Sequence, residues 1–299
     1  MLNNNIRISV VNFQPIWGDK ETNLDKIFGY IEKAEGTNLI VFPETALTGY
    51  DNEDVPKSEK MHLKIAETIP GPTTEKILEL AKKHNMIIVF GMIERDKEEP
   101  STIYNSVAVV QPSGETLSYR KIHLPGDEGS WATPGEKPLV FDTQWGPVGV
   151  SICYDTYYFP ELIRYSRGKG ARLHLNCTAN CDSVYEAVPL NETLQVYAMI
   201  NQLYIATAGM CGIGKYLNFK GGTSIVGTSE HSTKEVTYYA GLPFCDENGE
   251  TEAIYTADLD LGSIEKRCRD LMFEQNDFTG RPDFAPDIYA KMYAEIAES

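Results

Sequence analysis

Short apolar segments that fit β-strands alternate along this chain with longer segments that fit amphipathic helices. Residues 6–13 have the composition of a strand, and residues 23–35 have the apolar spacing of a helix. Strands that alternate with helices predict an α/β protein. The same alternation continues with strands expected at 38–43, 86–93, 148–153, 173–177, 203–208, 222–226 and 252–258, and with helices expected at 73–85, 160–169, 192–201 and 263–273.

One pair of strands interrupts this alternation, because only a turn separates them. Residues 105–111 and 116–120 flank Pro112-Ser113-Gly114, whose proline and glycine favour a turn. Hairpin strands are antiparallel, so we expect two mixed sheets stacked face to face, with helices on both outer sides. No linker divides the chain. A single domain is therefore expected over residues 1–299, with the proline-interrupted residues 279–299 as a C-terminal arm.

The charge balance of the chain argues against two classes of partner. Lysine and arginine number 27 against 43 aspartates and glutamates, which gives a formal charge of −16. Such a surface repels phosphate backbones and anionic lipids, so neither nucleic acid nor a membrane is expected as a partner. The sequence has no apolar run near the ~20 residues of a membrane span and no apolar signal-peptide segment. Its six irregularly spaced cysteines do not fit a secreted disulfide framework, so a cytoplasmic location is expected.

Cys153 is the candidate nucleophile, because it ends an apolar strand shortly before a helix. Pro160 suits the first turn of that helix. A thiol at such a corner meets backbone N–H groups and the positive end of a helix dipole, which lower a thiol pKa and stabilise an oxyanion. Inert packing is the ordinary expectation for the other cysteines, which are Cys177, Cys181, Cys211, Cys245 and Cys268.

Three charged residues follow other predicted strands or lie in a nearby loop. Glu44 comes directly after the apolar strand at 38–43, at the end where α/β sheets place their sites. Lys121 ends the hairpin, and an ammonium near a thiol lowers its pKa and donates to an oxyanion. Glu128 lies in a turn-rich loop, where it could hold Lys121 or share a proton with Glu44. With Cys153 they supply the nucleophile, the proton carrier and the fixed cation that amide or nitrile hydrolysis requires.

Two other kinds of site fit the sequence less well. The segment from Gly209 to Lys215 approaches a phosphate-binding loop, but Tyr216 stands where Ser or Thr should hold magnesium. His174, Cys177 and Cys181 form a loose cluster without the spacing of a zinc site, and in a strand the first two point to opposite faces.

The ordered motifs of the chain resemble those of the nitrilase superfamily, also called the carbon–nitrogen hydrolases. The resemblance runs from about residue 6 to residue 261. Its principal motifs are Phe42-Pro43-Glu44, Tyr119-Arg120-Lys121, Glu128 ahead of Pro134-Gly135, and Gly149-Val150-Ser151-Ile152-Cys153-Tyr154-Asp155. Weaker echoes are Tyr104-Asn105-Ser106, Asn201-Gln202-Leu203-Tyr204 and Gly221-Gly222-Thr223.

The resemblance implies a four-layer α-β-β-α sandwich that pairs into homodimers, and it implies neither a metal nor an organic cofactor. It implies Cys153 as nucleophile, Glu44 as general base and then acid, and Lys121 as the oxyanion partner. Glu128 is similar to a second glutamate that orients this group, and the backbone N–H of Tyr154 would complete the oxyanion hole.

The expected activity is hydrolysis of a small linear amide through a cysteine thioester, with release of ammonia or an amine. Trp131, Tyr157 and Tyr158 lie close in sequence to these positions and are expected to line the substrate site. No arginine follows Cys153 until Arg164, so an uncharged acyl portion is favoured. An N-carbamoyl amide hydrolase, a nitrilase, an acyltransferase and a non-catalytic module that binds a small molecule remain alternatives.

Overall fold

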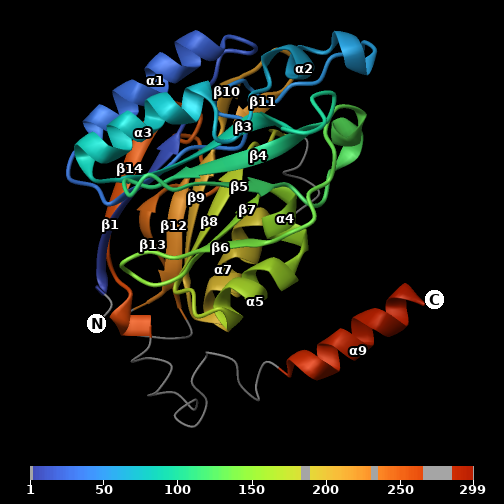
Figure 1. Ribbon diagram of the computed structural model, residues 1–299. Coiled ribbons are helices and arrows are strands. Elements are labelled where there is room, and N and C mark those ends of the chain that lie inside the picture. The colour runs from blue at the N-terminus through green and yellow to red at the C-terminus, as the bar shows by residue number, and fades with distance from the viewer. Residues whose placement is uncertain (1–2, 183–188, 230–234, 265–284, 299) are drawn as a thin grey trace.

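The computed structural model describes residues 3–182, 189–229, 235–264 and 285–298. Within these residues two six-stranded sheets are stacked face to face, with helices on both outer sides (Figure 1). The arrangement is the α-β-β-α sandwich that the sequence predicts.

The first sheet has the strand order β14-β1-β2-β3-β4-β5. Pairing is parallel for β1 with β2 and for β2 with β3, and antiparallel elsewhere, including the predicted hairpin of β4 and β5. The strands are β1 (Asn5–Asn12), β2 (Leu39–Val41), β3 (Ile87–Arg95), β4 (Ile103–Val110), β5 (Thr116–Arg120) and β14 (Ala253–Asp260).

Helices α1 (Lys20–Lys33) and α3 (Pro72–His84) cover the outer face of this sheet (Figure 1). Asp19 caps α1 by accepting a hydrogen bond from the backbone N–H of Thr22, and Pro72 opens α3. The apolar faces of the two helices pack on the strands through Ile31 and Ile77, among others. Both helices are therefore amphipathic elements held by the sheet.

The second sheet has the order β13-β12-β9-β8-β7-β6. Its central pairs, β7 with β8 and β8 with β9, are parallel. Helices α5 (Pro160–Gly168) and α7 (Leu190–Asn201) lie on its outer face (Figure 1). The strands are β6 (Leu139–Phe141), β7 (Val148–Ile152), β8 (Leu173–Thr178), β9 (Tyr204–Gly209), β12 (Ser224–Thr228) and β13 (Val236–Gly241).

The core between the sheets follows from the alternation of side chains along each strand. In β1, Val10 points into the inner core, whereas its neighbour Val11 packs under the outer helices. Val150 and Leu175 face inward from the second sheet. The carboxyl ends of β2 and β7, which are central to the candidate site, thus belong to two different sheets that pack on each other.

Several short elements were not predicted. They are the helices α2 (Met61–Ile65), α4 (Tyr154–Tyr158), η1 (Lys57–Glu59) and η2 (Gly126–Ser130), the strands β6 and β13, and the hairpin of β10 (Cys211–Ile213) and β11 (Asn218–Lys220). The helices among them have only three to five residues, too few for a helical period. The β10–β11 hairpin occupies the glycine-rich segment, and a strand follows Gly214 where a phosphate-binding loop requires a helix.

The C-terminal part of the chain is described only in places. The helix expected at residues 263–273 lies outside the described residues after Ile264, and so does the start of the expected arm at residue 279. Helix α9 (Pro286–Ala297) follows, and its apolar side chains are exposed. No helix in the described ranges is both long and apolar enough to cross a membrane.

Candidate active site

The four residues singled out from the motifs come from both sheets. Glu44 follows β2 and Lys121 follows β5 in the first sheet, and Glu128 lies on the short helix η2 beyond β5. Cys153 follows β7 of the second sheet. The side chains of Glu44, Lys121 and Glu128 are buried, although each carries an ionisable group.

A close approach between β3 and the turn after β2 places Glu44. The N–H of Gly91 donates to the carbonyl of Pro43 (3.0 Å), and the N–H of Leu47 donates to the carbonyl of Gly91 (3.1 Å). A Cβ atom on Gly91 would lie 2.2 Å from the backbone nitrogen of Thr45. Only glycine fits there without displacing the turn that carries Glu44.

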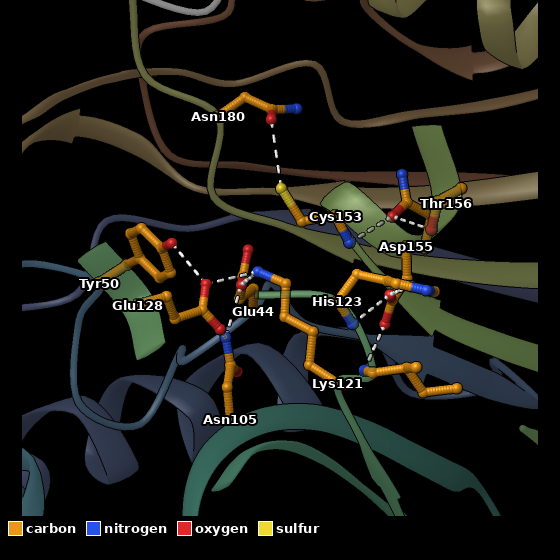
Figure 2. A network of polar contacts seen from close by, with 12 residues as sticks. Glu44, Tyr50, Asn105, Lys121, His123, Glu128, Cys153, Asp155, Thr156 and Asn180 are labelled. Carbon is orange, nitrogen blue, oxygen red and sulfur yellow. Dashed lines mark hydrogen bonds and ion pairs between the residues drawn. The ribbon is translucent and has the colours of Figure 1, made fainter. Parts of the chain in front are cut away.

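A compact network surrounds Lys121 (Figure 2). Its ammonium donates to Glu44 Oε1 and to Glu128 Oε2, each at 2.7 Å. The amide nitrogen of Asn105 donates to Glu44 Oε1 (2.7 Å) and Glu128 Oε1 (2.8 Å), and the hydroxyl of Tyr50 donates to Glu128 Oε2 (2.7 Å). The second oxygen of Glu44, Oε2, is buried and has no hydrogen-bond partner among the described residues.

Burial and charge act in opposite directions within this network. Burial raises the pKa of Glu44, Lys121 lowers it and Glu128 raises it further, so the net effect is an increase. Burial lowers the pKa of Lys121, but the charges of Glu128 and Glu44 outweigh it and hold that pKa well above its ordinary value. The lysine is therefore a fixed cation between two carboxylates.

Cys153 stands at a sharp corner between β7 and α4. Its φ of 46° and ψ of −104° lie in a region that side-chain-bearing residues rarely adopt. Its N–H donates to the carbonyl of Cys177 (3.0 Å) and to Asn176 Oδ1 (3.2 Å), which hold the corner in place. Its Sγ donates to Asn180 Oδ1 at 3.4 Å. Strained backbone held by several contacts is common at active sites.

The predicted direction of the thiol pKa was wrong. Burial raises the pKa of Cys153 to about 12, Glu44 raises it too, and Lys121 only partly offsets these effects. A neutral thiol is therefore the resting form. The position of Cys153 between a strand and a helix did not reveal that the carboxylate of Glu44 would be near enough to raise the thiol pKa.

Tyr154 is the first residue of α4, an additional short helix that begins immediately after Cys153, whereas the predicted helix begins at Pro160 as expected. At that position a backbone N–H has no acceptor within its own helix. Tyr154 also lines the cavity onto which Cys153 opens. Its N–H is thus next to the thiol in sequence and free of intrahelical bonding.

A cavity of about 620 Å³ lies over Cys153 and Glu128. The three expected binding residues, Trp131, Tyr157 and Tyr158, all line it. Trp131 is buried and stacks on His62, with ring centroids 4.1 Å apart. The hydroxyl of Tyr157 accepts from Asn176 and Asn180, whereas Tyr158 is 46% exposed.

The charged side chains among the described residues of this cavity wall are Asp51, Asp127 and Glu128. Backbone N–H groups of residues 215–217 donate hydrogen bonds to the carboxylate of Asp51. No lysine or arginine belongs to the wall as far as the structure describes it. Arg164 donates instead to Asn201 (3.4 Å), between α5 and α7.

Four polar residues of this site were not recognised from the sequence as functional. Asn105 appeared only within a weak motif, and Asp155 only as the last residue of the motif around Cys153. Tyr50 and Asn180 carry no periodic or motif signal of their own, because their contacts come from distant parts of the chain.

The loose cluster considered for zinc is not assembled. His174 is buried and bonds to Ser151 Oγ (2.8 Å) and Ser166 Oγ (3.1 Å), whereas Cys177 faces the core between the sheets. Among the described residues, no group of three or more His, Cys, Asp or Glu side chains is arranged to hold a metal ion.

Comparisons with known proteins identify the family of the chain. A family model described as carbon–nitrogen hydrolase matches residues 7–267. A nitrilase of Pyrococcus abyssi is 33% identical over 220 residues, which cover 72% of this chain and 79% of that protein. Omega-amidase NIT2-B of Xenopus laevis is 34% identical over 223 residues, covering 68% and 73% of the two chains.

Among solved structures, Nit3 of Saccharomyces cerevisiae, a member of the nitrilase superfamily, superposes with a TM-score of 0.77. Its sequence identity is 26%, and the match covers 91% of this chain and 96% of Nit3. The likeness therefore extends over nearly the whole sandwich.

Proposed function

Because the chain belongs to the carbon–nitrogen hydrolase family, we propose that it cleaves the C–N bond of a small, uncharged linear amide through a thioester on Cys153. The observation that carries this proposal is the hydrogen bonding of the Glu44 carboxylate. Lys121 and Asn105 hold its Oε1, while its buried Oε2 has no partner among the described residues. A carboxylate fixed by one oxygen keeps the other available to accept a proton.

In the first half of the reaction, the neutral thiol gives its proton to Glu44 as Sγ attacks the amide carbonyl carbon. At rest the thiol donates to Asn180, so the S–H bond must first turn toward Glu44. Glu44 then passes the proton to the leaving nitrogen as the C–N bond breaks. Ammonia departs, and the acyl group stays on Cys153 as a thioester.

Lys121 and Tyr154 stabilise the negative oxygen formed during attack. An ammonium has three N–H donors. Two of those of Lys121 go to Glu44 and Glu128, so among the described contacts one remains for the oxyanion. The backbone N–H of Tyr154 supplies a second donor. Removal of a single donor of this kind costs roughly 10²–10³-fold in rate.

In the second half, water attacks the thioester and Glu44 accepts its proton. The C–S bond breaks, the thiolate takes that proton back, and a carboxylic acid is released. Glu128 and Asn105 hold Lys121 and Glu44 in register through both halves. All atoms are accounted for by substrate and water, so the proposed reaction requires no metal or organic cofactor.

The cavity wall supports an uncharged acyl portion. A carboxylate buried without a cation is costly, and the described wall offers only carboxylates as charged groups. The Xenopus relative is called an omega-amidase. Because of that name, the most informative comparison is between neutral amides and ω-amides of dicarboxylic acids as substrates.

The test is ammonia release from four substrate classes: neutral primary amides such as butyramide, ω-amides of dicarboxylic acids, N-carbamoyl amino acids and nitriles. We expect the neutral amides to exceed the others by more than roughly tenfold in kcat/KM, about 1.4 kcal/mol of transition-state preference. A tenfold preference for an ω-amide or an N-carbamoyl acid would overturn the neutral-pocket argument.

The Cys153→Ala variant is the control for the chemistry. Loss of a nucleophile costs on the order of 10⁶-fold, so its ammonia release should fall to background while its thermal unfolding stays cooperative. Mass spectrometry of the parent with a slow amide should place an acyl group on Cys153. Turnover by the alanine variant would contradict the thioester, and turnover by neither chain would favour a module that only binds small molecules.

A further inference from the structure

Asp155 has a fully buried carboxylate that the proposed reaction does not use. It accepts four hydrogen bonds. Its Oδ2 accepts hydrogen bonds from the Tyr119 hydroxyl (2.6 Å) and from the Ile122 N–H (3.0 Å). Its Oδ1 takes the His123 N–H (2.9 Å) and contacts His123 Nδ1 (2.7 Å). Such saturation offsets much of the cost of burying a charge.

These bonds join the two halves of the site. Ile122 and His123 immediately follow Lys121, after the last strand of the first sheet, and Asp155 lies in α4, two residues after Cys153 and just beyond β7 of the second sheet. Figure 2 shows the Asp155 carboxylate directed at the backbone that leads away from Lys121. One side chain thus fastens the segment of the cation to the helical turn of the nucleophile.

The charge of Asp155 is what makes this fastening strong. Two of its donors are backbone N–H groups, which cannot turn elsewhere for an acceptor. A carboxylate satisfies all of them with two oxygens, whereas an asparagine amide presents one oxygen and one NH₂ group. Either orientation of that amide would leave an N–H group of Ile122 or His123 facing another donor.

We propose that Asp155 is a positioning residue for the reaction proposed above, and that it sets the placement of the Lys121 ammonium relative to the Cys153 thiol. It touches neither substrate nor the reacting atoms. Displacements of about 1 Å in a reacting group can cost roughly 10²-fold in rate. The proposal rests on the proposed function only for its catalytic consequence, because the contact between the two segments exists without substrate.

The test is Asp155→Asn, measured first by alkylation of Cys153 with iodoacetamide at pH 8 and located by mass spectrometry. Lys121 lowers the pKa of the Cys153 thiol. Displacing the ammonium should therefore slow alkylation, by roughly tenfold. A carboxylate with only a structural role would give the opposite result, because a loosened corner exposes the thiol and speeds alkylation.

Tyr119→Phe is the matched control. It removes one bond from the same carboxylate but frees no backbone N–H beside Lys121. Its alkylation rate should stay within about 1.5-fold of the parent. An unchanged or faster rate in Asp155→Asn, or equal slowing in both variants, overturns the proposal.

A second measurement separates this proposal from the proposed function. With butyramide as substrate, Asp155→Asn should lower kcat by roughly tenfold or more and change KM by less than about twofold. Absence of turnover in the parent would defeat the proposed function but leave the alkylation result interpretable. If Asp155→Asn does not fold, His123→Phe removes one bond and keeps a ring against Phe159. Its alkylation should slow by about threefold, and an unchanged rate there contradicts the proposal.

Discussion

Lys121 lies between the carboxylates of Glu44 and Glu128, and these charges change the pKa of Lys121 and of Glu44. For Glu44 the balance is an increase in pKa, to which burial contributes most and Glu128 adds. A general base must be deprotonated to act. In the proposed reaction, the pKa of Glu44 therefore sets the acid side of the activity profile.

We expect kcat/KM to fall with decreasing pH through a midpoint above 4.5, the ordinary pKa of a glutamate. Below that midpoint Glu44 is protonated and cannot accept the thiol proton. Replacing Glu128 by glutamine removes a charge that raises the pKa of Glu44, so the midpoint should move to lower pH in the residual activity of Glu128→Gln.

Tyr50→Phe is the control for this shift, because it removes a hydrogen bond to Glu128 and leaves the charge of Glu128 in place. Its midpoint should stay close to that of the parent. A midpoint that rises in Glu128→Gln, or does not move, would assign the acid limb to another group.

Some residues of the site could be recognised from the sequence, and others could not. Glu44, Lys121 and Cys153 could be singled out because each follows a strand within a recognisable motif. Asn105 contacts Glu44 across 61 positions and Tyr50 contacts Glu128 across 78, and neither contact leaves a local pattern. The thiol pKa was misjudged for the same reason, since burial and the approach of Glu44 arise only in the folded chain.

At the scale of elements, the close packing of β3 against the turn after β2 constrains the position of Glu44. Gly91→Ala would place a methyl group against the backbone at Thr45 and push the turn away. We expect a loss of about 1–3 kcal/mol in unfolding free energy. We also expect a larger relative loss of kcat, because the displaced turn carries Glu44.

Gly29→Ala in α1 is the matched control, because a Cβ atom there has no neighbour within 4 Å. It should raise the unfolding free energy by about 0.5–1 kcal/mol, as expected for glycine to alanine within a helix, and leave activity unchanged. Denaturant titration and ammonia release measure both effects. Normal activity in Gly91→Ala would show that the turn tolerates displacement.

The predictability of the elements follows their length and burial. The strand expected at residues 116–120 is observed with the same bounds, and the one at 148–153 ends one residue earlier. β6 has three residues, and every residue of β13 is partly exposed, so neither gives a clear alternation. The five residues of α4 are too few for a helical period, and this hid the helix that begins at Tyr154.

At the scale of the whole molecule, α9 is an amphipathic helix whose large apolar side chains lie mostly at the surface of the described chain. Ile288, Tyr289, Met292, Tyr293 and Ile296 are all about half exposed or more. Contiguous apolar surface of this kind marks interaction sites. We propose that α9 packs against a second copy of the chain in a homodimer.

Sedimentation should give a mass of two 33.4 kDa chains at micromolar concentration. Deletion of residues 286–299 should raise the dimer dissociation constant by roughly tenfold or more, since several apolar side chains would leave the interface. Replacing the exposed Lys291 by serine is the control and should leave the dissociation constant unchanged. A monomeric parent chain would contradict the proposal.

Cys153 and Glu44, the proposed nucleophile and proton carrier, follow strands of opposite sheets, so the side chains between the sheets determine how far the sulfur stands from the carboxylate. The core between the sheets includes side chains that do not line the active-site cavity, among them Val10, Val89, Val150 and Leu175. Protein interiors are close-packed and barely compressible, so they keep this separation nearly constant. The packing between the sheets therefore affects the rate of the proposed proton transfer as well as the free energy of unfolding. A methyl group remote from any substrate takes part in setting the length of a proton transfer.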